Sequence, residues 1–211
     1  MTSGIRISPW LAWSAGIFCV LVAAASLRFV PLGVEVSMPI MAHHLPGNAL
    51  LLYSHIAIAP LVLALLPLQL STRLRRRRPG LHRWLGRIYG AGILVSGIAS
   101  IDLALKTTAG PVALSGFLLL AILWLAATGL GIAAAIRRDI ASHRRWMLRS
   151  AAMTFAAVTL RICLGLSKVA GLPIDLVYPA IAWLCWVPNL LVVEWYFHRG
   201  RASPGAEVLA A

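Results

Sequence analysis

Residues 49–83 read ALLLYSHIAIAPLVLALLPLQLSTRLRRRRPGLHR, an apolar run that passes directly into a block of arginines. The apolar part, Ala49–Leu70, has about the 20 residues that an α-helix needs to cross the hydrocarbon core of a bilayer. Arginine and lysine gather in the short loops that remain in the cytoplasm. This stretch therefore predicts a membrane-spanning helix that ends in a cytoplasmic loop.

Further apolar runs of similar length lie on both sides of this stretch. They are Trp10–Val30, Trp84–Leu105, Pro111–Ile136, Ala151–Ala170 and Ile174–Phe197. The sequence therefore predicts an all-α fold, a polytopic transmembrane helix bundle of about six spans in a single domain, residues 1–211. The first run is longer than the usual apolar core of a signal peptide, so we expect it to be retained as a signal anchor.

The composition supports a membrane protein and argues against a nucleic-acid-binding one. Of the 211 residues, 60% are hydrophobic and 12% are charged, a ratio that a soluble domain of this length does not tolerate. The net charge of +13 is carried by short arginine blocks between apolar runs, not by a soluble surface interleaved with aromatic residues. We expect the lipid bilayer as a partner and no nucleic acid.

The positive charge also predicts the orientation. The connections 71–83 and 137–145 and the tail with His198, Arg199 and Arg201 are basic, whereas the alternate connections have almost no positive excess. By the positive-inside rule, the basic side is cytoplasmic and both termini lie there. We expect a multi-pass protein of the bacterial inner membrane.

Few catalytic motifs are present. The cysteines Cys19, Cys163 and Cys185 each lie inside an apolar run, which indicates packing residues and no disulfide framework. The chain has six acidic residues, no phosphate-binding glycine loop and no Cys-x-x-Cys pair. Whether the protein is an enzyme stays open at this point, as does its oligomeric state.

Two similar segments open the third and fifth predicted helices. They are His82-Arg83-Trp84-Leu85-Gly86-Arg87 and His143-Arg144-Arg145-Trp146-Met147-Leu148-Arg149. Because each follows a helix and a basic connection, residues 49–105 and 111–170 form a possible weak internal repeat. The alternative is that any cytoplasmic loop entering a helix is basic and aromatic.

These segments carry a resemblance to a known family. Together with His55, Pro67-Leu68-Gln69, the extension Ile88-Tyr89 and the segment Thr154–Arg161, they resemble bacterial membrane proteins designated domain of unknown function 2306. The resemblance covers roughly Ala49 to Arg161. It implies a multi-helix membrane protein and brings no established activity.

His82 and His143 are the first candidate site. Both lie at the cytoplasmic start of a predicted helix and hence at matching depth. A b-type haem needs two axial nitrogens on opposite faces of one porphyrin. The neighbouring Arg83 and Arg144 suit the haem propionates, because a guanidinium fork matches a carboxylate. The leading hypothesis is therefore a haem b electron-transfer protein, with quinone or another redox protein as partner.

Two alternatives accompany the haem hypothesis. Gly86, Gly90 and Gly97 follow His82 on one helical face, which can admit a flat macrocycle or another helix. The histidines and arginines can also form a rim that reaches lipid headgroups and fixes the topology.

His55 and Arg161 are the second candidate site. His55 lies about 9 Å inside the outer start of its helix, and Arg161 lies near mid-membrane at about 1.5 Å of rise per residue. An arginine there needs a cavity or a partner. Thr154, Arg161 and Lys168 recur every seven residues, which predicts an inward polar stripe.

This second site admits several functions. It can shape a quinone or second haem site, or form a polar pathway past His55, Arg161 and Lys168 in a non-redox transporter or permease-like protein. A structural arginine bonded to carbonyls near Pro60, or to Asp102, is the third possibility. An accessory membrane subunit without its own site is the remaining class.

The outer connection offers a candidate metal site. Met38, Met41, His43 and His44 supply the thioether and imidazole groups that suit copper. Alternatively, His43 or His44 completes an outer site with His55. Short clusters of this kind also arise by chance in loops beside membranes.

The orientation yields the first testable prediction. Reporter fusions after Arg78, after Arg138 and at the C-terminus should report the cytoplasm, because they follow the basic segments. Fusions near Val36 and Gly110 should report the opposite side. An exported C-terminus would overturn both the orientation and the number of spans.

Overall fold

The computed structural model describes residues 9–201, and the described chain is helical with no strand. Six segments are long and apolar enough to cross a membrane: Trp13–Leu32, Pro39–Leu70, Pro79–Leu105, Gly110–Ile136, Ile140–Val169 and Ile174–Arg199. The predicted all-α bundle of about six spans is confirmed. The terminal segments 1–8 and 202–211, which include the predicted cytoplasmic termini, lie outside the described residues.

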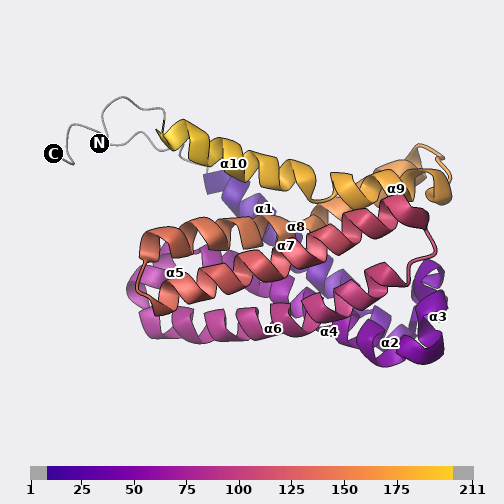
Figure 1. Cartoon of the computed structure of the whole chain (residues 1–211), viewed down its shortest axis with the longest axis horizontal. Helices are drawn as coiled ribbons and strands as arrows, with labels where there is room; N and C mark the ends of the chain where they lie inside the picture. The colour runs from indigo at the N-terminus through magenta and orange to yellow at the C-terminus, as the bar shows by residue number, and fades with distance from the viewer. Residues whose placement is uncertain (1–8, 202–211) are drawn as a thin grey trace.

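Four long helices form the centre of the bundle. They are α4 (Leu45–Leu70), α6 (Pro79–Leu105), α7 (Gly110–Ile136) and α8 (Ile140–Val169). Figure 1 shows α6, α7 and α8 running side by side, with α4 behind them. The first helix, α1 (Pro9–Leu27), packs on α4 and α8, while α9 (Ile174–Leu184) packs on α7 and α8, and α10 (Val187–Arg201) packs on α8.

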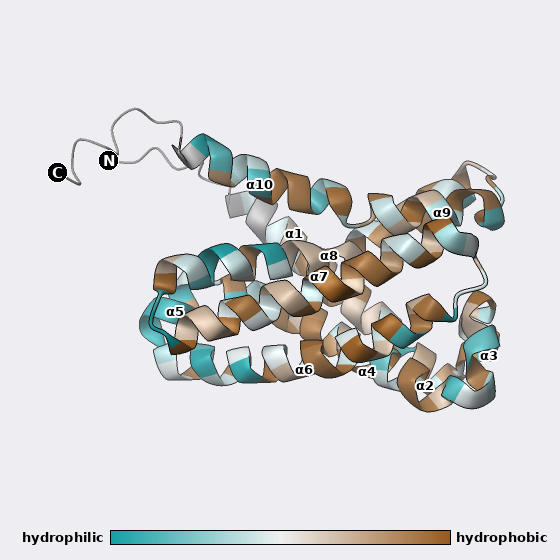
Figure 2. Cartoon of the chain, viewed as in Figure 1, coloured by the Kyte–Doolittle hydropathy of each residue, from teal (hydrophilic) through white to brown (hydrophobic). Residues whose placement is uncertain are grey.

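Hydrophilic residues collect at one end of the bundle. The short helix α5 (Thr72–Arg77) lies there with the start of α6 and the turn from α7 to α8 (Figure 2). The start of α1 and the end of α10 lie at the same end (Figure 1). The basic segments therefore share one side, as predicted, and the assignment of that side to the cytoplasm stays a prediction.

Two helices begin well before their predicted starts. Pro79 occupies the first turn of α6, where its missing N–H costs nothing. Asp139 caps α8, because its carboxylate accepts the N–H of Ser142 at 3.0 Å. His82 and His143 consequently lie inside the first turns of helices and not in loops.

The sixth span is interrupted between α9 and α10. Pro188 lacks an N–H, and its ring clashes with the carbonyl four residues earlier, so the helix stops at Leu184. Asn189 compensates for the break by donating its side-chain amide to the Cys185 carbonyl at 3.0 Å. The buried Cys185 and Trp186 hold the break against the bundle.

The outer connection between α1 and α4 consists of short helices. It contains α2 (Phe29–Leu32), α3 (Val34–Ser37) and the 3₁₀ helix η1 (Pro39–His44). Gly33 and Gly47 adopt φ angles of 75° and 80°, which only glycine adopts without strain, and thereby turn the chain at each side of α3 and η1. The outer connection is thus a folded cap over this end of the bundle.

A single hydroxyl joins three helices near mid-bundle. Thr154 Oγ1 on α8 lies 2.7 Å from Tyr89 Oη on α6, 2.9 Å from Trp124 Nε1 on α7 and 2.9 Å from the Ser150 carbonyl. Because Thr154 gives its one proton to that carbonyl, both Tyr89 and Trp124 donate to its oxygen. Thr128 and Ser150 form a second buried bond of 2.7 Å between α7 and α8.

We expect Thr154→Val to destabilise the fold by roughly 1–3 kcal/mol, because the Tyr89 and Trp124 donors lose their acceptor where no water replaces it. Chemical or thermal unfolding in detergent measures the loss. Ser115→Ala is the control, since that exposed hydroxyl bonds only the Val112 carbonyl of its own helix at 3.0 Å. Equal stability of the two variants would contradict the role of the Thr154 junction.

Candidate functional site

A cavity of about 220 Å³ lies between helices α1, α4, α6, α7, α8 and α9 and the outer cap. Most of its wall is apolar. Its polar lining residues are Ser26, His44, His55, Ser100, Thr107, Thr154, Arg161 and Tyr178. The structure thus brings His55 and Arg161 to one cavity, as their similar depth predicted.

Two serines on α6 hold the His55 ring. The Nδ1 atom lies 2.9 Å from Ser100 Oγ, 3.0 Å from Ser96 Oγ and 3.2 Å from the Ser96 carbonyl. The Ser96 carbonyl can only accept, and Ser100 donates its own proton to it at 2.7 Å, so we assign the hydrogen of the His55 ring to Nδ1. The lone pair of Nε2 then remains for a ligand, because no described residue hydrogen-bonds this atom.

Most N–H donors of the Arg161 guanidinium, which lines the cavity, have no partner among the described residues. One Nη1–H reaches the Ala157 carbonyl of the same helix at 2.9 Å. No other hydrogen bond joins this guanidinium to the described residues, and Asp102 is engaged elsewhere, with Asn48 and with Lys106 at 3.0 Å. The proposed pairing with Asp102 is therefore wrong, and His55 shares the cavity without a direct bond to Arg161.

The predicted stripe on α8 is only partly inward. Thr154 lines the cavity, but its hydroxyl is fully used by Tyr89, Trp124 and Ser150. Lys168 is exposed and does not line this cavity. Lys168 lies in the last turn of α8, about two turns beyond Arg161.

The outer candidate residues separate into two groups. Met38, Met41 and His44 line the cavity, and His44 is 3% exposed. His43 is exposed and directs Nδ1 to the Ile40 carbonyl at 2.9 Å, with its ring centroid 3.9 Å from that of His44. Among the described residues, no three His, Cys, Asp or Glu side chains gather into a metal-binding group.

His82 and His143 lie at the basic end, away from this cavity. They are close enough to interact electrostatically. His143 Nδ1 lies 2.8 Å from the Gly131 carbonyl, so it carries the hydrogen and leaves Nε2 as the basic atom. The Nδ1 of His82 is buried and has no hydrogen-bond partner among the described residues.

The glycine face of α6 packs against neighbouring side chains. A Cβ added at Gly90 would meet Ile132 at 2.8 Å, and one at Gly97 would meet Leu125 at 2.6 Å. At Gly86 the neighbour is Gln69, at 3.3 Å. These contacts are those expected of helix packing, and the haem alternative stays a hypothesis.

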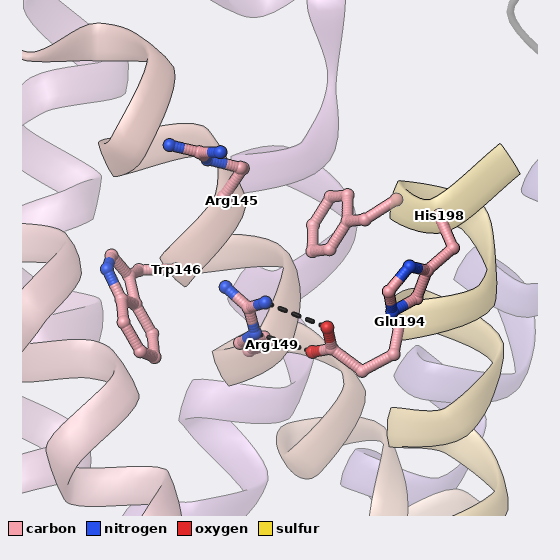
Figure 3. A pocket seen from close by; sticks show the side chains of 6 residues that line it. Arg145, Trp146, Arg149, Glu194 and His198 are labelled. Carbon is pink, nitrogen blue, oxygen red and sulfur yellow. Dashed lines mark hydrogen bonds and ion pairs between the residues drawn. The ribbon is translucent and has the colours of Figure 1, made fainter. Parts of the chain in front are cut away.

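Arg83 and Arg144 are exposed at the same end, where a second hollow of about 190 Å³ lies between α8 and α10. Figure 3 shows Arg149 in this hollow facing Glu194, with bonds of 2.5 and 2.8 Å. Its guanidinium also lies 4.7 Å from the Trp146 ring centroid and 5.0 Å from that of Phe197. We interpret the Arg149–Glu194 ion pair as a structural contact between α8 and α10, since the carboxylate of Glu194 neutralises the charge of Arg149.

Several site residues were missed by sequence reasoning. Ser96 and Ser100 lie four residues apart on one face of α6, a spacing that hinted at a partner for an intramembrane histidine. Tyr178 and Trp124 gave no comparable signal, because an aromatic residue in a span is ordinarily lipid-facing or packed.

The sequence comparisons agree with the fold. A family model described as "Predicted membrane protein (DUF2306)" matches residues 52–197, more than half of the chain. The matched segment continues beyond Arg161 through α9 and most of α10. No curated protein and no solved structure matches the chain.

Proposed function

Since the chain belongs to the DUF2306 family of predicted membrane proteins, whose description names no activity, we propose a function from the cavity itself. The proposal is a transporter or permease-like protein of the bacterial inner membrane. Its ligand is a small amphipathic carboxylate, bound between His55 and Arg161. The observation that carries this proposal is a guanidinium with uncommitted donors on the wall of a mostly apolar intramembrane cavity.

The charge of Arg161 favours an anion. A guanidinium in a bilayer is costly without a partner, and planar carboxylates match its parallel donors. Arg28, at the end of α1, is close enough to Arg161 for the two charges to repel each other. A bound carboxylate would relieve that repulsion and supply the missing acceptors.

His55 adds a second recognition group. As a neutral ring with hydrogen on Nδ1, it offers Nε2 to a ligand hydroxyl. When the ring takes up a proton, Nε2 becomes a donor and a second positive group beside the anion. The imidazole therefore suits a ligand that enters together with a proton.

The size and lining of the cavity suit a small ligand. Apolar side chains such as Leu63, Phe117 and Leu160 line the wall and would contact the ligand body. Trp124 and Thr154, whose hydroxyl also binds Tyr89, line the cavity. Binding between helices near the bilayer midplane is expected of a transporter.

Arg161→Lys tests the carboxylate proposal. Short-chain aliphatic and aromatic carboxylates should raise the melting temperature of the purified protein, and their neutral amides should not. Arg161→Lys should fold yet bind the carboxylates roughly ten- to a hundredfold more weakly, because the charge-assisted fork is worth about 1.5–3 kcal/mol.

The matched control is Arg144→Lys, an exposed arginine on the same helix. This control should leave carboxylate binding unchanged. Equal stabilisation by carboxylates and amides, or undiminished binding in Arg161→Lys, would contradict the proposal.

Haem b binding by His82 and His143 is the second candidate. It is supported by the buried, unpartnered Nδ1 of His82 and by the Gly131 carbonyl that orients His143. Against it, the glycine face is filled by Leu125 and Ile132. A bound haem would supply one-electron transfer, with quinone or another redox protein as the partner.

A visible spectrum tests the haem candidate. Protein expressed with added haem precursor should show a reducible Soret band that His82→Ala or His143→Ala abolishes. His198→Ala, at the same end of the bundle, should keep the band. A colourless protein excludes haem, and if carboxylates also fail to bind, an accessory subunit without its own site becomes the favoured class.

A further inference from the structure

Side chains of the outer cap that carry thioether or imidazole groups line the cavity. Met38 precedes η1, and Met41 and His44 lie on it at successive intervals of three residues. The bond of 2.9 Å from Met41 N to the Met38 carbonyl confirms the 3₁₀ turn. Side chains at i and i+3 are eclipsed in a 3₁₀ helix, so Met41 and His44 project from the same face of η1, and Met38 precedes it at the N-cap. All three line the cavity, whereas the intervening His43 is exposed.

His44 is a buried polar group without a partner. Its side chain is 3% exposed, and its Nδ1 atom makes no hydrogen bond within the described part of the chain. Burying an imidazole nitrogen in this way is unfavourable unless a ligand satisfies the ring. The nearest anionic group that acts on it electrostatically, Asp102, is already engaged by Asn48 and Lys106.

His55 presents to the same cavity a ring whose orientation is fixed by hydrogen bonds. Its Nδ1–H is held by Ser96 and Ser100, which fixes the ring and leaves Nε2 as the basic atom. This arrangement of an oriented imidazole with a hydrogen-bonded distal nitrogen is typical of metal-ligating histidines. The cavity therefore contains thioether and imidazole donors together.

We propose that the outer part of this cavity binds one Cu(I) ion through Met38, Met41 and His44, with His55 Nε2 completing the coordination. Thioether and imidazole ligands select Cu(I), whereas zinc sites use Cys, His and carboxylate groups. The described residues contain no such zinc-type cluster. Neutral donors also suit a singly charged ion in apolar surroundings. This site goes beyond the proposed transport function: it shares His55 with the carboxylate site and does not involve Arg161.

Anaerobic titration of the purified full-length protein with Cu(I), against a chromophoric Cu(I) chelator, tests the site. We expect one equivalent of Cu(I) to be withheld from the chelator, and the same protein to bind Zn²⁺ at least a hundredfold more weakly. Met38→Leu and Met41→Leu should each weaken Cu(I) binding at least tenfold. Leucine conserves the side-chain volume, so these variants should fold normally.

The controls separate this site from chance binding and from the carboxylate site. His43→Gln and Met147→Leu should leave Cu(I) affinity unchanged, because neither residue lines the cavity. Arg161→Lys should also retain Cu(I) while losing carboxylate binding. No competition with the chelator, or full affinity in the Met38→Leu/Met41→Leu double variant, would overturn the copper proposal and leave the transport proposal intact.

Discussion

Hydrogen bonding in a medium without water is the constraint on which this bundle depends. In the hydrocarbon core, every polar group needs a partner from the protein itself. Thr154 meets this need for two donors at once, by accepting from Tyr89 and Trp124 while bonding the Ser150 carbonyl. Three helices are thereby fixed relative to one another at a single oxygen, and the walls of the cavity are set by the same contacts.

The same constraint distinguishes structural from functional polar groups. Arg149 is matched by Glu194 and packed between two aromatic rings, so its charge is satisfied within the fold. Arg161, His55 and His44 lie on one cavity and keep donors or lone pairs that the described residues do not use. Polar groups left incomplete in such surroundings are expensive. Their concentration in one cavity is the physical reason to assign binding there.

The spans and the shared side of the basic segments were predictable, because length, hydropathy and arginine position report directly on a bilayer. Helix ends were less predictable: α8 begins at Ile140 because Asp139 caps it, a local effect that hydropathy does not register. Counting the rise per residue from the helix ends predicted that His55 and Arg161 lie at similar depth. It could not reveal that Ser96 and Ser100 bind the His55 ring. Pairing depends on helix rotation, which one sequence determines poorly.

The two ends of the bundle differ in how much rearrangement a ligand requires. A haem along the glycine face of α6 would have to displace Leu125 and Ile132, which occupy the space beside Gly97 and Gly90. Both residues lie on α7, so displacing them would cost packing energy between α6 and α7. A small carboxylate or a Cu(I) ion in the outer cavity displaces no core side chain and satisfies groups that are otherwise unpaired. A ligand bound in the outer cavity would therefore supply partners to polar groups that the fold leaves unpaired, whereas a haem at the basic end would first have to displace packed side chains.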